Sequence, residues 1–328
     1  MKPHTFIVLA IACCGLLCSS GCRWKGWSGF VSPWQQQQDA PPILFSSIPP
    51  KEELIAALNA STNRVNSLQS QGASVSLAGI PSLPTELAFE RPNKLRFRAS
   101  SSLLGPLVDM GSNEEMLWFW TSQSNPPNVF FARHDRLAAS SIRQQLAIDP
   151  NMFIEALGFV QLSPEFVVGE PVSADKNRLK LVVRQPTPAG DLTRTMFINA
   201  QHGYLMEQQI ADAAGRPMLS AKLSQQRYYK VDSVTLPHRV ELQMPGEGMR
   251  VQLDVPRYQI NQPFGEAGAT FAFPREQLGQ YQMVDIADPN FVPPGQSPPA
   301  QYSSPGYSQP GIGQVPAADR YRGAGNGR

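Results

Sequence analysis

Apolar and polar residues alternate along most of the chain, and this alternation predicts a protein built mainly of β-strands. From about residue 73 to residue 261 the period is two over many short runs, as in strands that bury one face. Turn sequences separate the runs, at Arg91-Pro-Asn, Gly111-Ser-Asn, Asn125-Pro-Pro, Ala189-Gly-Asp, Ala214-Gly-Arg-Pro and Pro245-Gly-Glu-Gly. Many strands joined by hairpins favour one large antiparallel sheet that curls.

Two stretches follow a different pattern and predict helices. The first, Lys51–Leu68, lies between Pro50 and Gly72 and has an apolar face of Leu54, Leu58, Val65 and Leu68. The second, from Asp135 to Phe159, lacks alternation and predicts one or two helices. The later one would begin at Asp149-Pro150 and have an apolar face of Phe153, Ile154 and Leu157. The sequence therefore predicts an α+β half-barrel, a curled antiparallel sheet whose concave face is covered by an N-terminal helix and a helical insertion.

Residues 1–21 have the layout of a lipoprotein signal peptide, and Cys22 directly after them is the predicted lipidation site. The apolar run from residue 6 to residue 17 is too short to cross a bilayer as a helix. Ser19-Ser-Gly-Cys resembles a lipobox, although Ser19 stands where leucine is usual. Ala10-Ile-Ala-Cys is a second match, and an ordinary secretory signal or an uncleaved anchor is the alternative. We expect a diacylglycerol and an acyl chain such as palmitate on Cys22, and no cofactor.

Composition marks the other boundaries. Residues 22–48 mix cations, tryptophans and a glutamine run, which predicts a membrane tether and linker. Residues 49–288 carry the periodic patterns and form the predicted half-barrel domain. Residues 289–328 hold 8 Pro and 7 Gly with almost no aliphatic residues, so we expect a disordered tail.

Charge and cysteine usage exclude several function classes. The net charge of +2 is too small to indicate nucleic-acid binding. All four cysteines lie within the first 22 residues. The rest of the chain therefore has no disulfide, thiolate nucleophile or cysteine-ligated zinc. His134-Asp135 is the one suggestive pair, and a surface histidine beside a helix-capping Asp135 explains it better than a metal site. Without a Gly-x-Ser-x-Gly or a phosphate-binding loop, we expect no catalytic residue, no metal and no enzymatic activity.

Three segments resemble the LolA/LolB-like superfamily of periplasmic lipoprotein and lipid carriers. They are the helix Lys51–Leu68, the strand pair from Glu86 to Arg98 and the return strand from Val108 to Trp120. The resemblance covers roughly residues 50–285 and rests on element order and short phrases, without a signature motif. It implies a half-barrel of about eleven strands with helices over an apolar cavity, and a carrier function that needs no covalent chemistry.

The strands that would line such a cavity are rich in large apolar residues. In Leu117-Trp-Phe-Trp, either Leu117 and Phe119 or Trp118 and Trp120 must face inward. The candidates for an acyl-chain cavity are Leu87, Phe89, Leu95, Phe97, Leu117 and Phe119. The same pattern also fits a core filled by these side chains.

LolB-type carriers have a leucine that protrudes from a hairpin, and the matching turn here runs from Ser100 to Leu107. Leu103, Leu104 and Leu107 surround its Gly-Pro pair, and Leu104 is the best match. Exposed leucines at a hairpin tip indicate a contact with a partner. The alternative is that the loop folds over the mouth of the barrel as core. No residue matches the arginine with which these carriers hold their lid.

We therefore expect a membrane-anchored envelope lipoprotein that binds lipid or lipoprotein acyl chains. It would act as carrier or acceptor in outer-membrane lipoprotein or lipid localisation. We expect no nucleic-acid partner. The alternative is a structural or interaction lipoprotein with a filled core, which contacts envelope proteins through its tail or through the Leu103–Leu107 loop. Arg23, in place of an aspartate after Cys22, favours the outer over the inner membrane, with the domain facing the periplasm.

Overall fold

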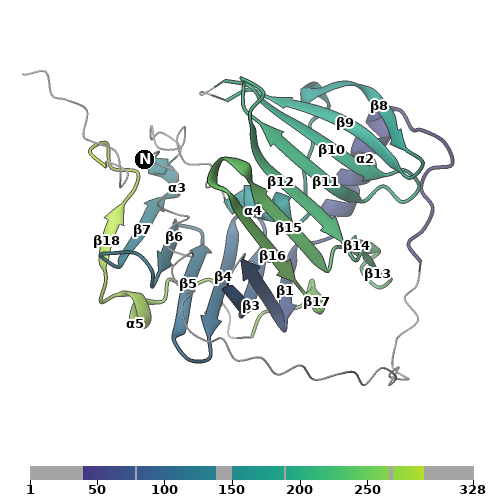
Figure 1. The fold of residues 1–328 in the computed structure, drawn as a ribbon. Helices are drawn as coiled ribbons and strands as arrows, with labels where there is room; N and C mark the ends of the chain where they lie inside the picture. Colours follow the sequence, from purple (N-terminus) through teal and green to yellow (C-terminus); the bar gives the residue numbers. More distant parts are fainter. Residues whose placement is uncertain (1–39, 78–79, 138–149, 188–189, 266–268, 292–328) are drawn as a thin grey trace, which may run out of the picture.

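The computed structural model describes residues 40–77, 80–137, 150–187, 190–265 and 269–291 (Figure 1). Cys22, the tether up to residue 39, Asp149 and the tail from residue 292 lie outside the described residues. The described chain forms a curled sheet of sixteen strands that carries its two longest helices on one face. The predicted α+β class and the curled, mainly antiparallel sheet are confirmed.

Consecutive hairpins build the two halves of this sheet. The strands of the first half are β1 (Ser67–Gln71), β2 (Ala73–Leu77), β3 (Ile80–Glu90), β4 (Lys94–Ser101), β5 (Gly105–Ser112), β6 (Met116–Thr121) and β7 (Asn128–Arg133). The strands of the second half are β8 (Val167–Asp175), β9 (Arg178–Gln185), β10 (Leu192–Asn199), β11 (Leu205–Ala211), β12 (Pro217–Ser224), β15 (Arg239–Met244), β16 (Met249–Asp254) and β17 (Arg257–Ile260). The hairpin of β13 (Arg227–Tyr229) and β14 (Val234–Leu236) stands apart as a small second sheet.

The two halves join where β16 pairs with β2. With β18 (Gln282–Asp285) at one edge, the order is β18-β7-β6-β5-β4-β3-β2-β16-β15-β12-β11-β10-β9-β8. β1 pairs with β3 and with β17, so that Leu68 lies opposite both Phe89 and Ile260. β18 runs parallel to β7. The sheet therefore has more strands than the predicted number of about eleven. β1, β17 and β18 pair across long sequence separations, which a local pattern cannot reveal.

Helix α2 (Lys51–Asn63) is shorter than the predicted helix Lys51–Leu68. Its buried residues include Leu54, Ile55 and Leu58, and two glutamates lie in its first turn, where the helix dipole favours them. Leu68 is buried as predicted, but it lies on β1. Pairing with β3 and β17 satisfies the backbone of this segment in place of helical hydrogen bonds.

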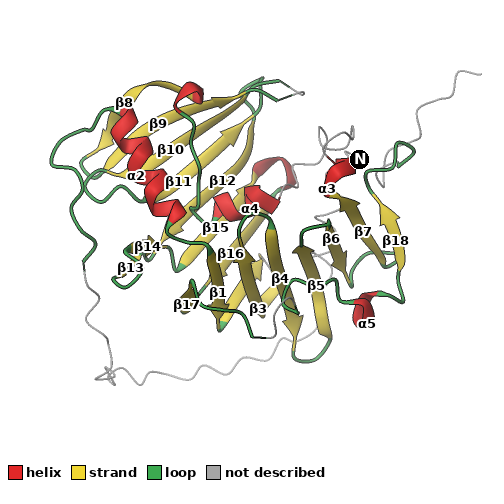
Figure 2. Ribbon diagram, turned by 180° about the vertical axis from the view of Figure 1, so that it is seen from behind, coloured by secondary structure: helices red, strands yellow, loops and turns green. Residues whose placement is uncertain are grey.

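The helical insertion begins with α3 (His134–Leu137) and ends with α4 (Pro150–Ala156). Ile154 of α4 and Leu157 just after it are buried in the core, and Phe153 packs against the same cluster, as predicted. Figure 2 shows α2 and α4 on the same side of the sheet, which we call the inner face. The opposite side is called the outer face.

Two apolar clusters fill the inner face beneath these helices. One joins α2 to β9, β10, β11 and β12, and the other joins α4 and the residues after it to β3, β4, β15 and β16. The packed core of the domain therefore lies between the helices and the sheet.

The C-terminal segment covers part of the outer face. Its short helix α5 (Arg275–Leu278) follows Phe273, whose ring lies 5.5 Å from that of Trp118. Tyr281 packs against Trp120 with ring centroids 5.3 Å apart. The outer face of β6 and β7 is thus covered by chain that follows β17 in sequence.

Candidate functional site

Large apolar side chains form a row across the inner face of β3 to β7. Leu87 lies opposite Phe97, Phe97 opposite Met110, Met110 opposite Phe119, and Phe119 opposite Phe130. Residues that lie opposite each other in an antiparallel ladder share one face of the sheet. Leu87 is fully buried, whereas the other four side chains are half-buried.

A second row runs parallel to the first and is fully buried. It consists of Phe89, Leu95, Ser112, Leu117 and Ala132. All six residues predicted to line a cavity therefore share the inner face. On β6, Leu117 and Phe119 face inward, and Trp118 and Trp120 therefore face outward.

Aromatic contacts close the inner face over β3 and β4. The ring of Phe159 meets that of Phe89 edge-on at 5.0 Å, and the ring of Phe153 on α4 meets that of Phe97 at 5.5 Å. In this conformation the space above Leu87 and Leu95 is occupied by side chains of the helical insertion and the residues after it.

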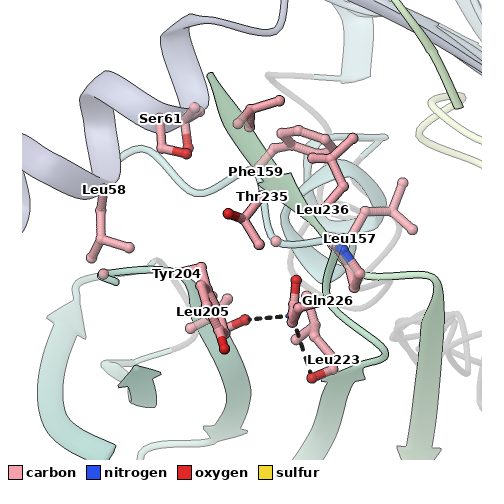
Figure 3. Close-up of a pocket in the computed structure, with 15 residues that line it drawn as sticks. Leu58, Ser61, Leu157, Phe159, Tyr204, Leu205, Leu223, Gln226, Thr235 and Leu236 are labelled. Carbon is pink, nitrogen blue, oxygen red and sulfur yellow. Dashed lines mark hydrogen bonds between the residues drawn. The ribbon is translucent and has the colours of Figure 1, made fainter. Parts of the chain in front are cut away.

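A small pocket between α2, the residues after α4 and the β13–β14 hairpin shows how tightly this region packs (Figure 3). Gln226 crosses it and donates from Nε2 to the carbonyl oxygens of Leu205 and Leu223, at 3.2 and 3.5 Å. The pocket has a volume of about 20 Å³, which is enough for about one water molecule. An acyl chain does not fit there without movement of the helices.

The inner face of β5 to β7 is covered less completely. Met110 is a partly buried residue packed against the central cluster, and the ring of Phe130 lies 6.5 Å from that of Phe291. Phe119 lies between them on the neighbouring strand and is half-buried. Of the predicted cavity residues, Leu87, Phe89 and Leu95 are buried in the cluster under α4, Leu117 is buried against Ile286 and Ala287, and Phe97 and Phe119 are half-buried.

Two polar side chains of the inner face hold helix α4. Arg194 on β10 donates from Nη2 to the Glu155 carboxylate at 2.5 Å. Gln208 on β11 donates from Nε2 to the backbone oxygen of Glu155 at 2.9 Å. Both side chains are buried, and a buried charge is stable only when it is paired. α4 is therefore fastened to the sheet at one residue.

Helix α2 is linked to the same insertion by three further hydrogen bonds. The Asn59 amide donates to the oxygen of Leu162 and accepts from its N–H, both at 2.8 Å, and the Thr62 hydroxyl donates to the oxygen of Val160 at 2.8 Å. α2, residues 157–162 and α4 thus form one connected cover, which we call the lid.

The residues that fasten the lid were not among those predicted from the sequence. Arg194 occupies an inward position of β10, two residues before buried Met196 and four before buried Ile198. A charged residue in the apolar phase of a strand is the signal that identifies such a position.

The turn between β4 and β5 projects into solvent. Leu103 is 92% exposed and Leu104 is 60% exposed, while Leu107 is half-buried. The Ser101 hydroxyl accepts the N–H groups of both leading leucines, at 3.2 and 3.3 Å, and Gly105 has a φ of +73°. The interpretation in which the tip folds back as core is therefore wrong for Leu103 and Leu104.

His134 and Asp135, the pair singled out in the sequence, each have a polar partner in the structure. His134 Nε2 lies 2.8 Å from the carbonyl oxygen of Asn113, and Asp135 pairs with Arg133 at 3.2 Å. Asp135 lies inside α3, so the helix cap predicted for it is wrong. In the part of the chain that the structure describes, no group of three or more metal-ligating side chains comes together.

Comparisons with known proteins concern the fold alone. No protein-family model and no curated protein sequence matches the chain. Similar solved structures include a domain assigned to outer membrane lipoprotein sorting from Vibrio parahaemolyticus, at 9% identity and a TM-score of 0.45. A LolA superfamily protein from Nitrosomonas europaea is similar at 8% identity and a TM-score of 0.42. A DUF1329 family protein from Desulfovibrio piger is similar at 11% identity and a TM-score of 0.38.

Each of these matches covers 66% of this chain and 93% to 96% of the other chain. At such low identities no ligand or partner transfers from them to this protein. Within the described residues, no helix has the length and apolar character needed to cross a bilayer.

Proposed function

We propose that this protein binds acyl chains of a lipid or lipoprotein on its inner face, as a membrane-anchored carrier or acceptor of the bacterial envelope. The observation that carries the proposal is the half-buried row of Phe97, Met110, Phe119 and Phe130 beside a helix that polar contacts fasten. Such a row offers continuous apolar surface at the point where the cover of the sheet ends.

Movement of α4 would extend this surface. Release of the contacts at Glu155 would uncover Phe97 first and then the buried Leu87 and Phe89, which α4 and Phe159 now cover. Burial of a lipid chain contributes about 0.8 kcal/mol per methylene group, so an acyl chain of ordinary length can replace the helix's own side chains. Transfer then depends on relative affinity and requires no covalent step.

The anchor and the hairpin tip fit the same function. A lipid on Cys22 would hold the protein at the periplasmic side of a membrane, with the outer membrane favoured by Arg23. The exposed Leu103 and Leu104 at the β4–β5 turn would contact the membrane or a delivering protein.

A titration of the delipidated full chain with a fluorescent fatty acid tests this function. We expect saturable binding that Phe119→Ser weakens at least about tenfold, because one large apolar side chain contributes about 1.5–3 kcal/mol when buried. Val168→Ser, on the edge strand β8 where Val168 is 48% exposed, is the matched control and leaves the affinity unchanged. No uptake by the wild-type chain, or equal loss in both variants, would overturn the proposal.

A second candidate function is an interaction lipoprotein whose inner face stays filled. The tight packing of Phe89 with Phe159 and the 20 Å³ pocket favour it. In that case envelope proteins captured by the full chain are lost when residues 289–328 are deleted, and fatty acid does not bind.

A further inference from the structure

A second hollow lies on the outer face, on the opposite side of the sheet from the proposed lipid surface. It is a pocket of about 490 Å³ between β1, β3, β4 and the residues that follow 268. Polar groups that line it are Gln69, Ser70, Glu86, Arg96, Arg98, Thr270 and Gln277. Small-molecule sites are concave and hold convergent polar groups that orient the ligand, and this pocket has such groups in unusual number.

Arg96 forms the buried wall of this pocket. It is 6% exposed, donates from Nη2 to Asp109 at 2.7 Å and from Nη1 to the oxygen of Ala272 at 3.0 Å. Its Nε has no hydrogen-bond partner among the described residues. A buried donor left unpaired costs about 1–3 kcal/mol, so a ligand that reached this N–H by displacing its neighbours would relieve that cost.

The network around Arg96 fixes its position. Asp109 also accepts the indole N–H of Trp118 at 2.9 Å, and the Arg96 guanidinium lies 5.2 Å from the centre of the Trp118 ring. A Cβ at Gly111 would come within 2.1 Å of that ring, so glycine is required for the indole to lie across β5. The guanidinium is therefore held in place before any ligand arrives.

Arg98 lies two residues further along β4, on the same face. Its contacts are long, at 3.4 Å to Glu86, 3.3 Å to Gln277 and 3.7 Å to Asp109. The Glu86 side chain is 75% exposed, and exposed pairs of this kind contribute little. An incoming group can replace them at small cost.

The remaining lining groups are mostly donors. The Ser70 oxygen already accepts the N–H of Leu87 at 2.9 Å, which leaves its hydroxyl hydrogen to donate. Gln277 uses its amide oxygen for Arg98, which leaves its amide hydrogens. Two cationic side chains, Arg96 and Arg98, and one carboxylate, that of Glu86, line the pocket, and both guanidinium groups contact the buried Asp109.

We propose that this outer-face pocket binds a small polar molecule through a carboxylate or phosphate group, held between Arg96 and Arg98. Planar guanidinium groups match both oxyanions, and a paired arrangement of donors suits either. Glu86 at the rim opposes the ligand's charge and weakens binding.

Calorimetric titration of the intact protein at constant ionic strength tests this site. The probes are N-acetylglycine for the carboxylate, glycerol 3-phosphate and inorganic phosphate for the phosphate, and glycerol as the neutral comparison. We expect saturable binding of at least one anionic probe, and the probe that binds identifies the group. Arg98→Gln weakens it at least about tenfold, because a charge-assisted contact is lost.

The opposite charge change is the matched control. Glu86→Gln removes a negative charge on the same face and frees Arg98, so it tightens binding severalfold. Unfolding midpoints of both variants establish that they are folded. The proposal is overturned if no anion binds, if glycerol binds equally well, or if Arg98→Gln leaves the affinity unchanged.

Discussion

At the scale of single residues, buried polar groups determine what the domain can do. Arg194 and Gln208 face inward among aliphatic neighbours, and each finds its partner on one residue of α4. On the outer face, Arg96 and Asp109 form the corresponding buried pair. Apolar burial stabilises the sheet, and these few polar contacts determine where its covers are attached.

His238 yields a residue-scale prediction about pH. Burial lowers the pKa of His238 to about 4, and its Nε2 lies 3.0 Å from the Tyr229 hydroxyl. Between pH 6.5 and pH 4 the unfolded chain binds a proton at this residue that the folded chain does not. Stability is therefore lost as the pH falls through this window, by at most about 3 kcal/mol. Urea unfolding across pH 4–7 measures it, and His238→Gln should flatten that part of the profile. If the free energy of unfolding depends on pH in the same way in the wild type and in His238→Gln, His238 does not have this role.

At the scale of elements, helix α4 is the part expected to move. Glu155→Gln removes the ion pair with Arg194 but keeps the backbone contact with Gln208, so we expect α4 to open more often. Hydrogen exchange at the amides of residues 153–157 should accelerate about tenfold, and fatty acid uptake should become faster. A tenfold change corresponds to about 1.4 kcal/mol, which is within the range of about 1–3 kcal/mol for the loss of a partly buried charged contact.

The ion pair of Arg239 on β15 with Asp254 on β16 provides the matched control for Glu155→Gln. It is nearly as close, at 2.7 Å compared with 2.5 Å for Arg194 and Glu155, but it is partly exposed on the outer face. Asp254→Asn should leave uptake unchanged and stability within about 1 kcal/mol. If both carboxamide variants accelerate uptake equally, α4 is not the moving part.

The β4–β5 hairpin gives a second element-scale prediction. Replacement of both Leu103 and Leu104 by serine should leave stability within about 0.5 kcal/mol, because both are exposed. In the Cys22→Ser chain, binding to phosphatidylethanolamine/phosphatidylglycerol vesicles should fall severalfold in a sedimentation assay. Val231→Ser, at the 98% exposed position between β13 and β14, should bind like the parent chain. Equal binding of all three would remove the tip from membrane contact.

At the scale of the whole molecule, the sequence predicted what local pattern controls. Period-two alternation identified many of the strands and placed Leu87, Phe89, Leu95 and Phe97 on one face. It could not show that Leu68 pairs in a strand. Leu68 follows the buried Val65 by three residues, and this spacing fits one face of a helix as well as a buried position on β1. The covering of Trp118 by Phe273 and the contact of Glu155 with Arg194 arise from residues far apart in the chain. Such contacts follow from the topology of the sheet, which alternation alone does not determine.

When α4 moves, the inner face is expected to take up an acyl chain. Native mass spectrometry of the full chain, delipidated and then incubated with a fatty acid, measures this most directly. We predict one bound fatty acid per chain in the wild type and a marked loss of that species in Phe119→Ser, with Val168→Ser unchanged. A wild-type spectrum that contains only the unliganded mass would contradict the account and favour the filled core.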